Sequence, residues 1–140
     1  MITSTDIIQS ARKWIGTPFV HQGRCLGAGV DCAGVVIGVA QDLNIAPDDF
    51  ADPKGYAPNP ANRLIEQLMD KWLVRVPKGN AKPGDILFFR YARLPQHMGI
   101  LTDRGTFIHA YKVGPGVVEV TYDRAWQRAT VRAYRFRGVE

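Results

Sequence analysis

The sequence predicts an α+β domain, with helices in the first half of the chain and an antiparallel sheet in the second. The first half carries apolar residues at helical spacing, and the second half changes after the turn at 82–85 to short apolar runs. Because helices and strands do not alternate, a doubly wound parallel sheet is excluded. The 140 residues are about one domain's worth of chain, so residues 1–140 are expected to form a single domain.

Three amphipathic helices are expected before residue 74. The first follows Ser4 and Thr5 as candidate caps and stops at Gly16, with an apolar stripe formed by Ile7, Ile8, Ala11, Trp14 and Ile15. The second covers 32–43 with Asp31 as N-cap, and the third covers 64–73. Between them, 46–62 is rich in proline, aspartate and asparagine, which indicates an irregular excursion of the kind that often carries specificity.

Five strands are expected in the second half, at 86–91, 97–102, 106–111, 117–122 and 131–137. The turn at 103–105 sets the register of the central hairpin, because a three-residue loop with Gly105 in the left-handed position pairs residues whose numbers sum to 208. His97 then faces Tyr111, and His109 is its diagonal neighbour on the same face. The basic residues of 124–137 are interpreted as one solvated face of a half-exposed strand.

Composition and charge exclude several classes of protein. With 46% apolar and 22% charged residues, the chain is neither disordered nor collagen-like nor a coiled coil. No apolar run is long enough to cross a membrane, and the N-terminus lacks the pattern of a signal peptide, so we expect a soluble chain that is not secreted by itself. The net charge of +5 favours polyanions in general, and we predict neither a nucleic-acid partner nor membrane insertion.

Cys32 is the candidate nucleophile. The predicted second helix begins at this residue, and the unsatisfied N–H groups and dipole of a helix start favour a thiolate over a thiol. The alternative is that Cys32 is a small buried apolar residue, as many free cysteines are. The second cysteine, Cys25, lies in a glycine-rich loop and is expected to be off the mechanism, although a Cys25–Cys32 disulfide would silence the nucleophile if it formed.

His97 and His109 are candidate partners of this thiol because they share one face of the predicted sheet. A base that takes the thiol proton and a polar residue that orients the base complete the usual logic of nucleophilic catalysis, with His97 as the base. The alternatives are two structural sheet histidines, or a Cys/His/His metal site for which no fourth ligand is evident. Asp31 has two compatible interpretations, a helix cap and a negative charge that receives a substrate amine.

The chain resembles the NlpC/P60 superfamily of cell-wall cysteine peptidases over residues 16–38 and 83–110. GTPFVHQGR followed by DCAGVV is similar to the family's entry segment and nucleophile box, while PGDILFF, HMGIL and IHA are similar to its strand, base and third-residue boxes. The resemblance implies a papain-like fold with N-terminal helices packed on a C-terminal antiparallel sheet. It also implies Cys32 as nucleophile, His97 as general base and His109 as the residue that orients it, with no cofactor and no metal.

The resemblance further implies a function and a setting. The expected activity is that of a cysteine endopeptidase that hydrolyses amide bonds in peptidoglycan stem peptides, at the bond from γ-D-glutamate to the diamino acid. Val20, His21 and Gln22, together with the lack of an appended wall-binding domain, resemble the stand-alone branch found in phage tails, prophages and gene-transfer particles. The expected partners are therefore the peptidoglycan peptide and phage tail proteins, and a tail would carry the enzyme from the cytoplasm to the cell wall.

Two departures from the family pattern bear on activity. Phe19 stands where many members have a tyrosine, so oxyanion stabilisation is expected to depend on the backbone N–H of Cys32, with His21 and Gln22 as further candidate donors. Ala33 stands where serine is common, which removes a hydroxyl group. These departures keep open a weakly active or inactive tail-assembly or wall-docking protein of the same fold, and a Cys/His acyl-transfer enzyme with an apolar acyl tunnel.

Overall fold

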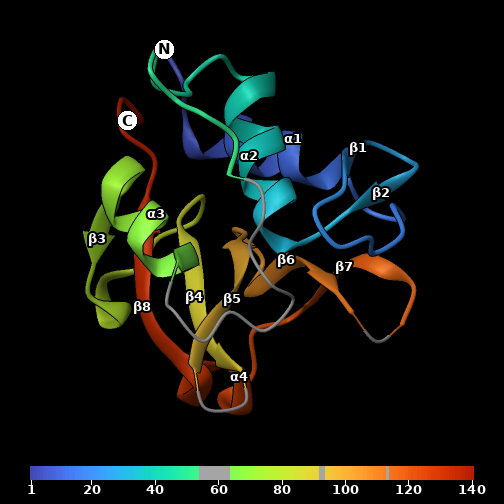
Figure 1. Cartoon of the computed structure of the whole chain (residues 1–140). Coiled ribbons are helices and arrows are strands. Elements are labelled where there is room, and N and C mark those ends of the chain that lie inside the picture. The colour runs from blue at the N-terminus through green and yellow to red at the C-terminus, as the bar shows by residue number, and fades with distance from the viewer. Residues whose placement is uncertain (54–63, 92–93, 113) are drawn as a thin grey trace.

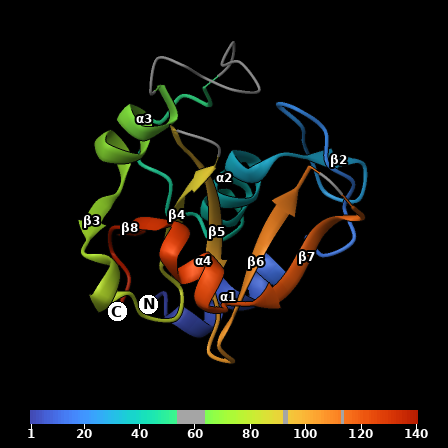
Figure 2. The same ribbon diagram turned by 90° about the horizontal axis from the view of Figure 1, so that it is seen from below.

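The protein consists of a six-stranded antiparallel sheet with helices on both faces (Figure 1 and Figure 2). The computed structural model describes residues 1–53, 64–91, 94–112 and 114–140. One face of the sheet carries three helices, and the other carries one short helix. The helices are α1 (Ser4–Arg12), α2 (Cys32–Asp42), α3 (Leu64–Trp72) and α4 (Arg124–Ala129). The predicted α+β class, with N-terminal helices packed on a C-terminal antiparallel sheet, is confirmed.

The six strands follow the order β3-β8-β4-β5-β6-β7 across the sheet. They are β3 (Val74–Val76), β4 (Ile86–Tyr91), β5 (Leu94–Leu101), β6 (Thr106–Tyr111), β7 (Gly116–Thr121) and β8 (Thr130–Arg135). The five strands expected from the sequence are present, with ends shifted by a few residues. The short edge strand β3 and a two-stranded hairpin, β1 (Arg24–Cys25) with β2 (Gly29–Val30), were not expected. Strands of two or three residues are too short to show an alternating pattern.

The start of α1 differs from the sequence prediction. The N-cap is Thr3 rather than Ser4 or Thr5, and Thr3 forms a reciprocal capping box with Asp6. The helix ends at Arg12, so Trp14 and Ile15 lie beyond it. Trp14 is buried, whereas Ile15 is 45% exposed and does not belong to the apolar stripe. A Thr-x-x-Asp pattern was available to identify the cap, because the carboxylate at the third helical position can bond back to the cap's own N–H.

The interpretation of 124–137 as one strand is wrong in its first half. Asp123 caps α4 by accepting a hydrogen bond from the Trp126 N–H, and the strand begins only at Thr130. The basic face is also less solvated than expected, because Arg132 pairs with Glu66 and Arg135 pairs with Asp85. Both carboxylates lie on buried residues far away in the sequence, so the sequence pattern of this segment does not reveal them.

The predicted register of the β5–β6 hairpin is confirmed beside its turn. Gly105 has a positive φ of 69°, and the paired residues are Ile100 with Ile108 and Leu101 with Phe107. The regular pairing of β5 with β6 ends there, and Figure 2 shows the two strands diverging beyond that point. The predicted pairing of His97 with Tyr111 is therefore not part of the ladder, although both histidines lie on the predicted face.

The excursion after α2 is described only for residues 46–53, and the rest of the predicted 46–62 segment lies outside the described residues. Phe50 packs edge-on against Trp72 of α3, with ring centroids 5.5 Å apart. Asp52 accepts hydrogen bonds from Arg24 of the β1–β2 hairpin. This part of the excursion is therefore held both to α3 and to the segment that precedes α2.

No helix in the described ranges is long and apolar enough to cross a membrane.

Gly38 in the middle of α2 makes room for a tryptophan. A Cβ at this position would lie 2.2 Å from Cζ2 of the buried Trp14, which packs α2 against the segment after α1. Helix propensity alone predicts that alanine would stabilise α2 by about 1 kcal/mol. The contact reverses this preference, because the indole would have to move out of a filled core.

We expect Gly38→Ala to lower the free energy of unfolding by about 1–3 kcal/mol, the usual cost of overpacking a core. Denaturant unfolding of the purified protein measures this change. Gly79→Ala is the matched control, because a Cβ there meets no atom within 4 Å, and it should change stability by less than about 0.5 kcal/mol. A Gly38→Ala variant as stable as the wild type would contradict the packing argument.

Candidate active site

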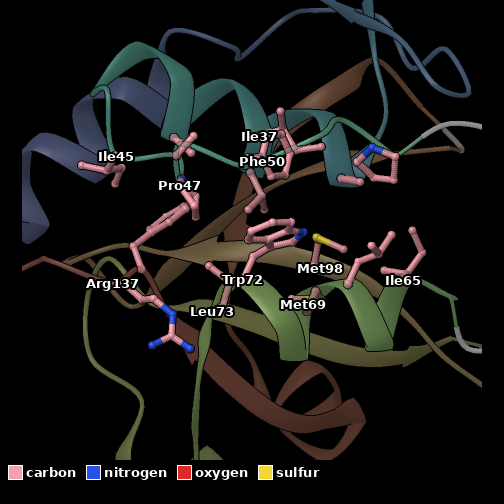
Figure 3. A pocket seen from close by; sticks show the side chains of 17 residues that line it. Ile37, Ile45, Pro47, Phe50, Ile65, Met69, Trp72, Leu73, Met98 and Arg137 are labelled. Atoms are coloured by element: carbon pink, nitrogen blue, oxygen red, sulfur yellow. The ribbon is translucent and has the colours of Figure 1, made fainter.

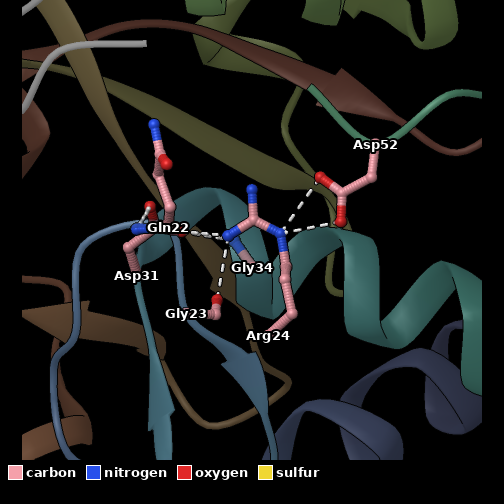
Figure 4. Close-up of polar contacts among 6 residues, drawn as sticks. All are labelled: Gln22, Gly23, Arg24, Asp31, Gly34 and Asp52. Carbon is pink, nitrogen blue, oxygen red and sulfur yellow. Dashed lines mark hydrogen bonds and ion pairs between the residues drawn. The ribbon is translucent and has the colours of Figure 1, made fainter. Parts of the chain in front are cut away.

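Cys32 is the first residue of α2. Polar contacts of Gln22, Gly23 and Arg24 with Asp31 and Gly34 surround this helix start (Figure 4). Asp31 is the N-cap, and its Oδ1 accepts a 2.8 Å hydrogen bond from the Gly34 N–H. Gly34 has no room for a side chain, because a Cβ would lie 2.5 Å from the carbonyl oxygen of Gly23 and 3.1 Å from Nη1 of Arg24. The DCxG pattern thus has a physical basis. It supplies a cap, a thiol, and a glycine that leaves room for Gly23 and Arg24 to pack against the helix start.

The divergence of β5 from β6 gives the thiol access to the sheet. Beyond Ile100 and Ile108 the two strands no longer pair, and the backbone N–H of Met98 in β5 donates a hydrogen bond to the Cys32 sulfur. Gly99 of β5 still packs closely on side chains of β6, since a Cβ there would lie 2.8 Å from the Phe107 ring and 3.2 Å from Cβ of His109. The start of α2 therefore meets β5 beside His97.

His97 and His109 form a directly hydrogen-bonded pair. The distance from His97 Nε2 to His109 Nδ1 is 2.7 Å. His109 is buried and His97 is half-buried. When Nδ1 of His97 is unprotonated and able to accept a proton, its Nε2 carries hydrogen and donates to His109. The pair can therefore fix the tautomer in which His97 acts as a base.

An aromatic wall lies behind this pair, and sequence reasoning missed its main element. Trp126 of α4 has its ring centroid 5.3 Å from that of His109 and 6.2 Å from that of His97. Phe89 stacks on His97 at 5.8 Å, and Phe107 lies 4.7 Å from His109. The register of β4 against β5 shifts just after Phe89, and such bulges are common beside active sites. The wall leaves little water around the imidazoles.

Burial opposes charge on all three side chains. It raises the pKa of the Cys32 thiol to about 12, and the negative charge of Asp31 adds to this effect, whereas N–H groups of Met98, Ala33 and Cys32 itself act in the opposite direction. Burial lowers the pKa of His97 to about 3, with a contribution from His109, and lowers the pKa of His109 to about 4. The N–H groups at the helix start therefore act on the thiol in the direction that the sequence predicts, but burial outweighs them.

The Asp31 carboxylate already accepts hydrogen bonds from other groups of the protein. This favours its interpretation as a helix cap over that of a receptor for a substrate amine. The carboxylate is buried, and it accepts hydrogen bonds from the N–H groups of Gln22 and Gly34 and from Arg24 Nη1, at 2.8–2.9 Å. A substrate ammonium here would also approach the Arg24 guanidinium. Arg24 was not singled out from the sequence, because one arginine in a glycine-rich loop carries no local signal.

The other predicted site residues lie on the segment that runs beside β2. Phe19 is half-buried and forms an isolated parallel bridge with Val30. The Val20 N–H donates to the carbonyl oxygen of Val30, and the Val30 N–H donates to that of Pro18. His21 is half-buried, and Gln22 has a positive φ of 60° and joins the site through its backbone N–H. The structure thus places Phe19, His21 and Gln22 next to the strand that leads into Cys32. Their roles at the oxyanion stay predictions.

An apolar cavity of about 80 Å³ lies between α2 and α3, beside the site (Figure 3). Ala33 and Met98, the sequence neighbours of Cys32 and His97, contribute to its wall, together with Ile37, Ile65 and Trp72. Its volume is about half that of the roughly 150 Å³ apolar cavity that binds benzene in an engineered protein. A space of this size fits a small apolar group.

A metal centre finds no support in the part of the chain that the structure describes. No group of three or more histidine, cysteine, aspartate or glutamate side chains is placed there to hold a metal ion.

The fold and the site together define a papain-like α+β protein with a cysteine at a helix start and a histidine pair on the facing sheet.

Comparisons with known proteins agree with this class. The NlpC/P60 family matches residues 16–135, so the chain belongs to the NlpC/P60 family. It is 31% identical over 135 residues to a γ-DL-glutamyl hydrolase of Bacillus subtilis, and 27% identical over 124 residues to a γ-D-glutamyl-L-lysine dipeptidyl-peptidase of the same species. These matches cover 93% and 85% of this chain but only 29% and 36% of the relatives, so the chain spans about a third of their length.

Solved structures show the same fold. The NlpC/P60 domain of the peptidoglycan hydrolase SagA superimposes with a TM-score of 0.67 at 24% identity, covering 96% of this chain and 100% of that domain. An NlpC/P60 family protein from Bacillus cereus gives a TM-score of 0.68 at 19% identity, covering 96% of this chain and 40% of that protein. At these identities the likeness concerns the fold alone.

The buried histidine pair predicts a loss of stability in mild acid. Unfolded histidine binds a proton near pH 6.5, whereas the folded pair does so only near pH 3 to 4. Between these values the unfolded state binds more protons, so the free energy of unfolding falls as the pH falls. From pH 7.5 to 5.5 we expect a loss of about 1.4 kcal/mol for each histidine, measured by denaturant unfolding.

The double variant His97→Gln/His109→Gln tests the origin of this loss, because it should flatten the dependence between pH 7.5 and 5.5. The carboxylates of Asp42, Asp70 and Glu119 do not interfere in this window, since their pKa values are lowered by their partners. An equally steep loss in the double variant would show that other groups cause it.

Proposed function

We propose that the protein is a cysteine peptidase that hydrolyses amide bonds in peptidoglycan stem peptides. The observation that carries this proposal is the meeting of three side chains, with Cys32 at the start of α2 bonded to the Met98 N–H and His97 bonded at 2.7 Å to His109. Family membership supports a peptidoglycan substrate. The names of the two Bacillus subtilis relatives support a γ-glutamyl bond, and we propose cleavage from γ-D-glutamate to the diamino acid.

Catalysis begins from a neutral Cys32 thiol and a neutral His97 imidazole. As the Cys32 sulfur attacks the carbonyl carbon, its proton passes to Nδ1 of His97, while His97 Nε2 donates to His109 and so spreads the positive charge. Backbone N–H groups at the start of α2 stabilise the oxyanion, a role that Phe19 cannot share because it has no hydroxyl group.

The second half of the reaction regenerates the enzyme. His97 returns its proton to the leaving amine, the C–N bond breaks, and a thioester remains on Cys32. Water then adds to the thioester while its proton passes to His97, the C–S bond breaks, and the thiol recovers its proton. Every proton transfer in these steps involves Cys32, His97, the leaving amine or water, so the reaction needs no other catalytic group.

We expect Cys32→Ala and His97→Ala to lower kcat by about 10³-fold or more, because each removes a group that bonds to the reacting atoms or moves their proton. His109→Ala should cost less, about 10²-fold, since His109 acts through His97. The measurement is digestion of purified peptidoglycan under reducing conditions, with the released fragments identified by mass spectrometry and ending in γ-linked D-glutamate.

Cys25→Ser is the matched control, because Cys25 is exposed and lies on the β1–β2 hairpin. It should keep wild-type turnover, and a loss of most activity would place Cys25 in the mechanism. If the wild type releases no fragments while a tail protein still binds it, the peptidase proposal fails and a tail-assembly or wall-docking protein replaces it.

Delivery by a phage or prophage-like tail is a further part of the proposal. Its support is the likeness of residues 20–22 to the phage-tail branch of the family. We expect the protein, made in the cytoplasm, to copurify with tail particles of its source and to be detected there by mass spectrometry. Its absence from intact particles would exclude this route to the cell wall.

A further inference from the structure

Arg24 links the helix that carries the nucleophile to the excursion after it (Figure 4). Its Nη1 lies 2.9 Å from Asp31 Oδ1 and 2.9 Å from the carbonyl oxygen of Gly23. Its Nε donates to both carboxylate oxygens of Asp52, at 3.1 and 3.0 Å. The side chain is 20% exposed and that of Asp31 only 4%, so the Arg24–Asp31 ion pair is shielded from solvent.

The charge of Asp31 is a difficulty for the nucleophile. Asp31 is the residue directly before Cys32. A carboxylate in the adjacent position disfavours the negative charge that must form on the Cys32 sulfur during attack. Burial weakens the screening that water would provide. The carboxylate is nevertheless needed, because it caps α2 through the Gly34 N–H and holds the Gln22 N–H.

We propose that Arg24 is a positioning residue for the nucleophile, which holds the Asp31 carboxylate in its capping position and offsets its negative charge at the Cys32 sulfur. This inference rests on the proposed function in taking Cys32 as the nucleophile. The Asp31 charge contributes to the elevated pKa of the thiol, so this charge does act on the sulfur. Asp52 binds the same guanidinium through Nε, whereas Asp31 binds it through Nη1.

Gly34 supports the same arrangement. Its missing side chain leaves the space in which Nη1 of Arg24 reaches Asp31 and the Gly23 carbonyl oxygen. The charged or titratable groups around the start of α2 are Asp31 at its cap, Arg24 on the hairpin and Asp52 on the excursion, with His97 and His109 on the sheet.

The test measures the reactivity of the thiol itself, in a Cys25→Ser background where Cys32 is the remaining cysteine. Alkylation rates with iodoacetamide are compared at several pH values from 8 to 10, where the rate is proportional to the thiolate fraction because the pKa of the thiol is higher. Arg24→Gln leaves the Asp31 charge without its guanidinium, so we expect alkylation to be about tenfold slower at each pH. This change corresponds to a rise of about one unit in the pKa of the thiol.

Two further variants separate charge balance from a general structural effect. Arg24→Gln/Asp31→Asn removes both charges, and asparagine is as good an N-cap as aspartate, so the alkylation rate should return to within about twofold of the parent rate. Asp52→Asn is the matched control, because it removes the outer partner and keeps the Arg24–Asp31 pair. It should leave the rate within the same twofold range. Thermal unfolding verifies that each variant is folded.

The outcomes are distinct. An unchanged alkylation rate in Arg24→Gln, or a double variant that stays as slow as Arg24→Gln, overturns the inference. If Arg24→Gln does not fold, Asp31→Asn decides, since an unchanged rate there would show that the Asp31 charge does not act on the sulfur and would overturn the inference as well. The shift in alkylation does not require turnover, so a protein with the shift but no peptidase activity refutes the proposed function and not this inference.

Discussion

The site depends on the point at which β5 separates from β6. A continuous ladder would use the Met98 N–H to hold the next strand and would close the sheet against α2. Because pairing ends at Ile100 and Ile108, the Met98 N–H bonds to Cys32 instead, and the helix start reaches the strand that carries His97. A helix has unsatisfied N–H groups at its start, so the same point offers both a nucleophile and the donors that an oxyanion needs.

Burial gives this site its chemical character. Trp126, Phe89 and Phe107 surround the histidines, and α2 lies against the core, so charge is disfavoured on the thiol and on both imidazoles. The neighbouring His109 accepts a hydrogen bond from His97 and so holds the imidazole in the orientation that a base needs.

Family membership and the local structure answer different questions about this chain. The likeness to the NlpC/P60 family accounts for the fold and the order of the sequence boxes. The arrangement around Asp31 is a feature of this protein's own structure, in which Arg24 joins the cap of α2 to Asp52. The small apolar cavity beside Ala33 and Met98 likewise limits which groups can lie next to the nucleophile.

The sequence by itself determined the helix-then-strand order, the Asp31 cap and the common face of His97 and His109, because periodicity, capping and turn chemistry act over a few residues. It did not reveal α4, the edge strand β3 or the cap at Thr3, where the segments are short or two capping patterns compete. Only the tertiary structure decided that Trp126 backs the histidines, that Arg24 pairs with Asp31 and Asp52, and that the Met98 N–H reaches Cys32. These contacts join residues far apart in the chain, and no local pattern records how a folded sheet splits or which charges it encloses.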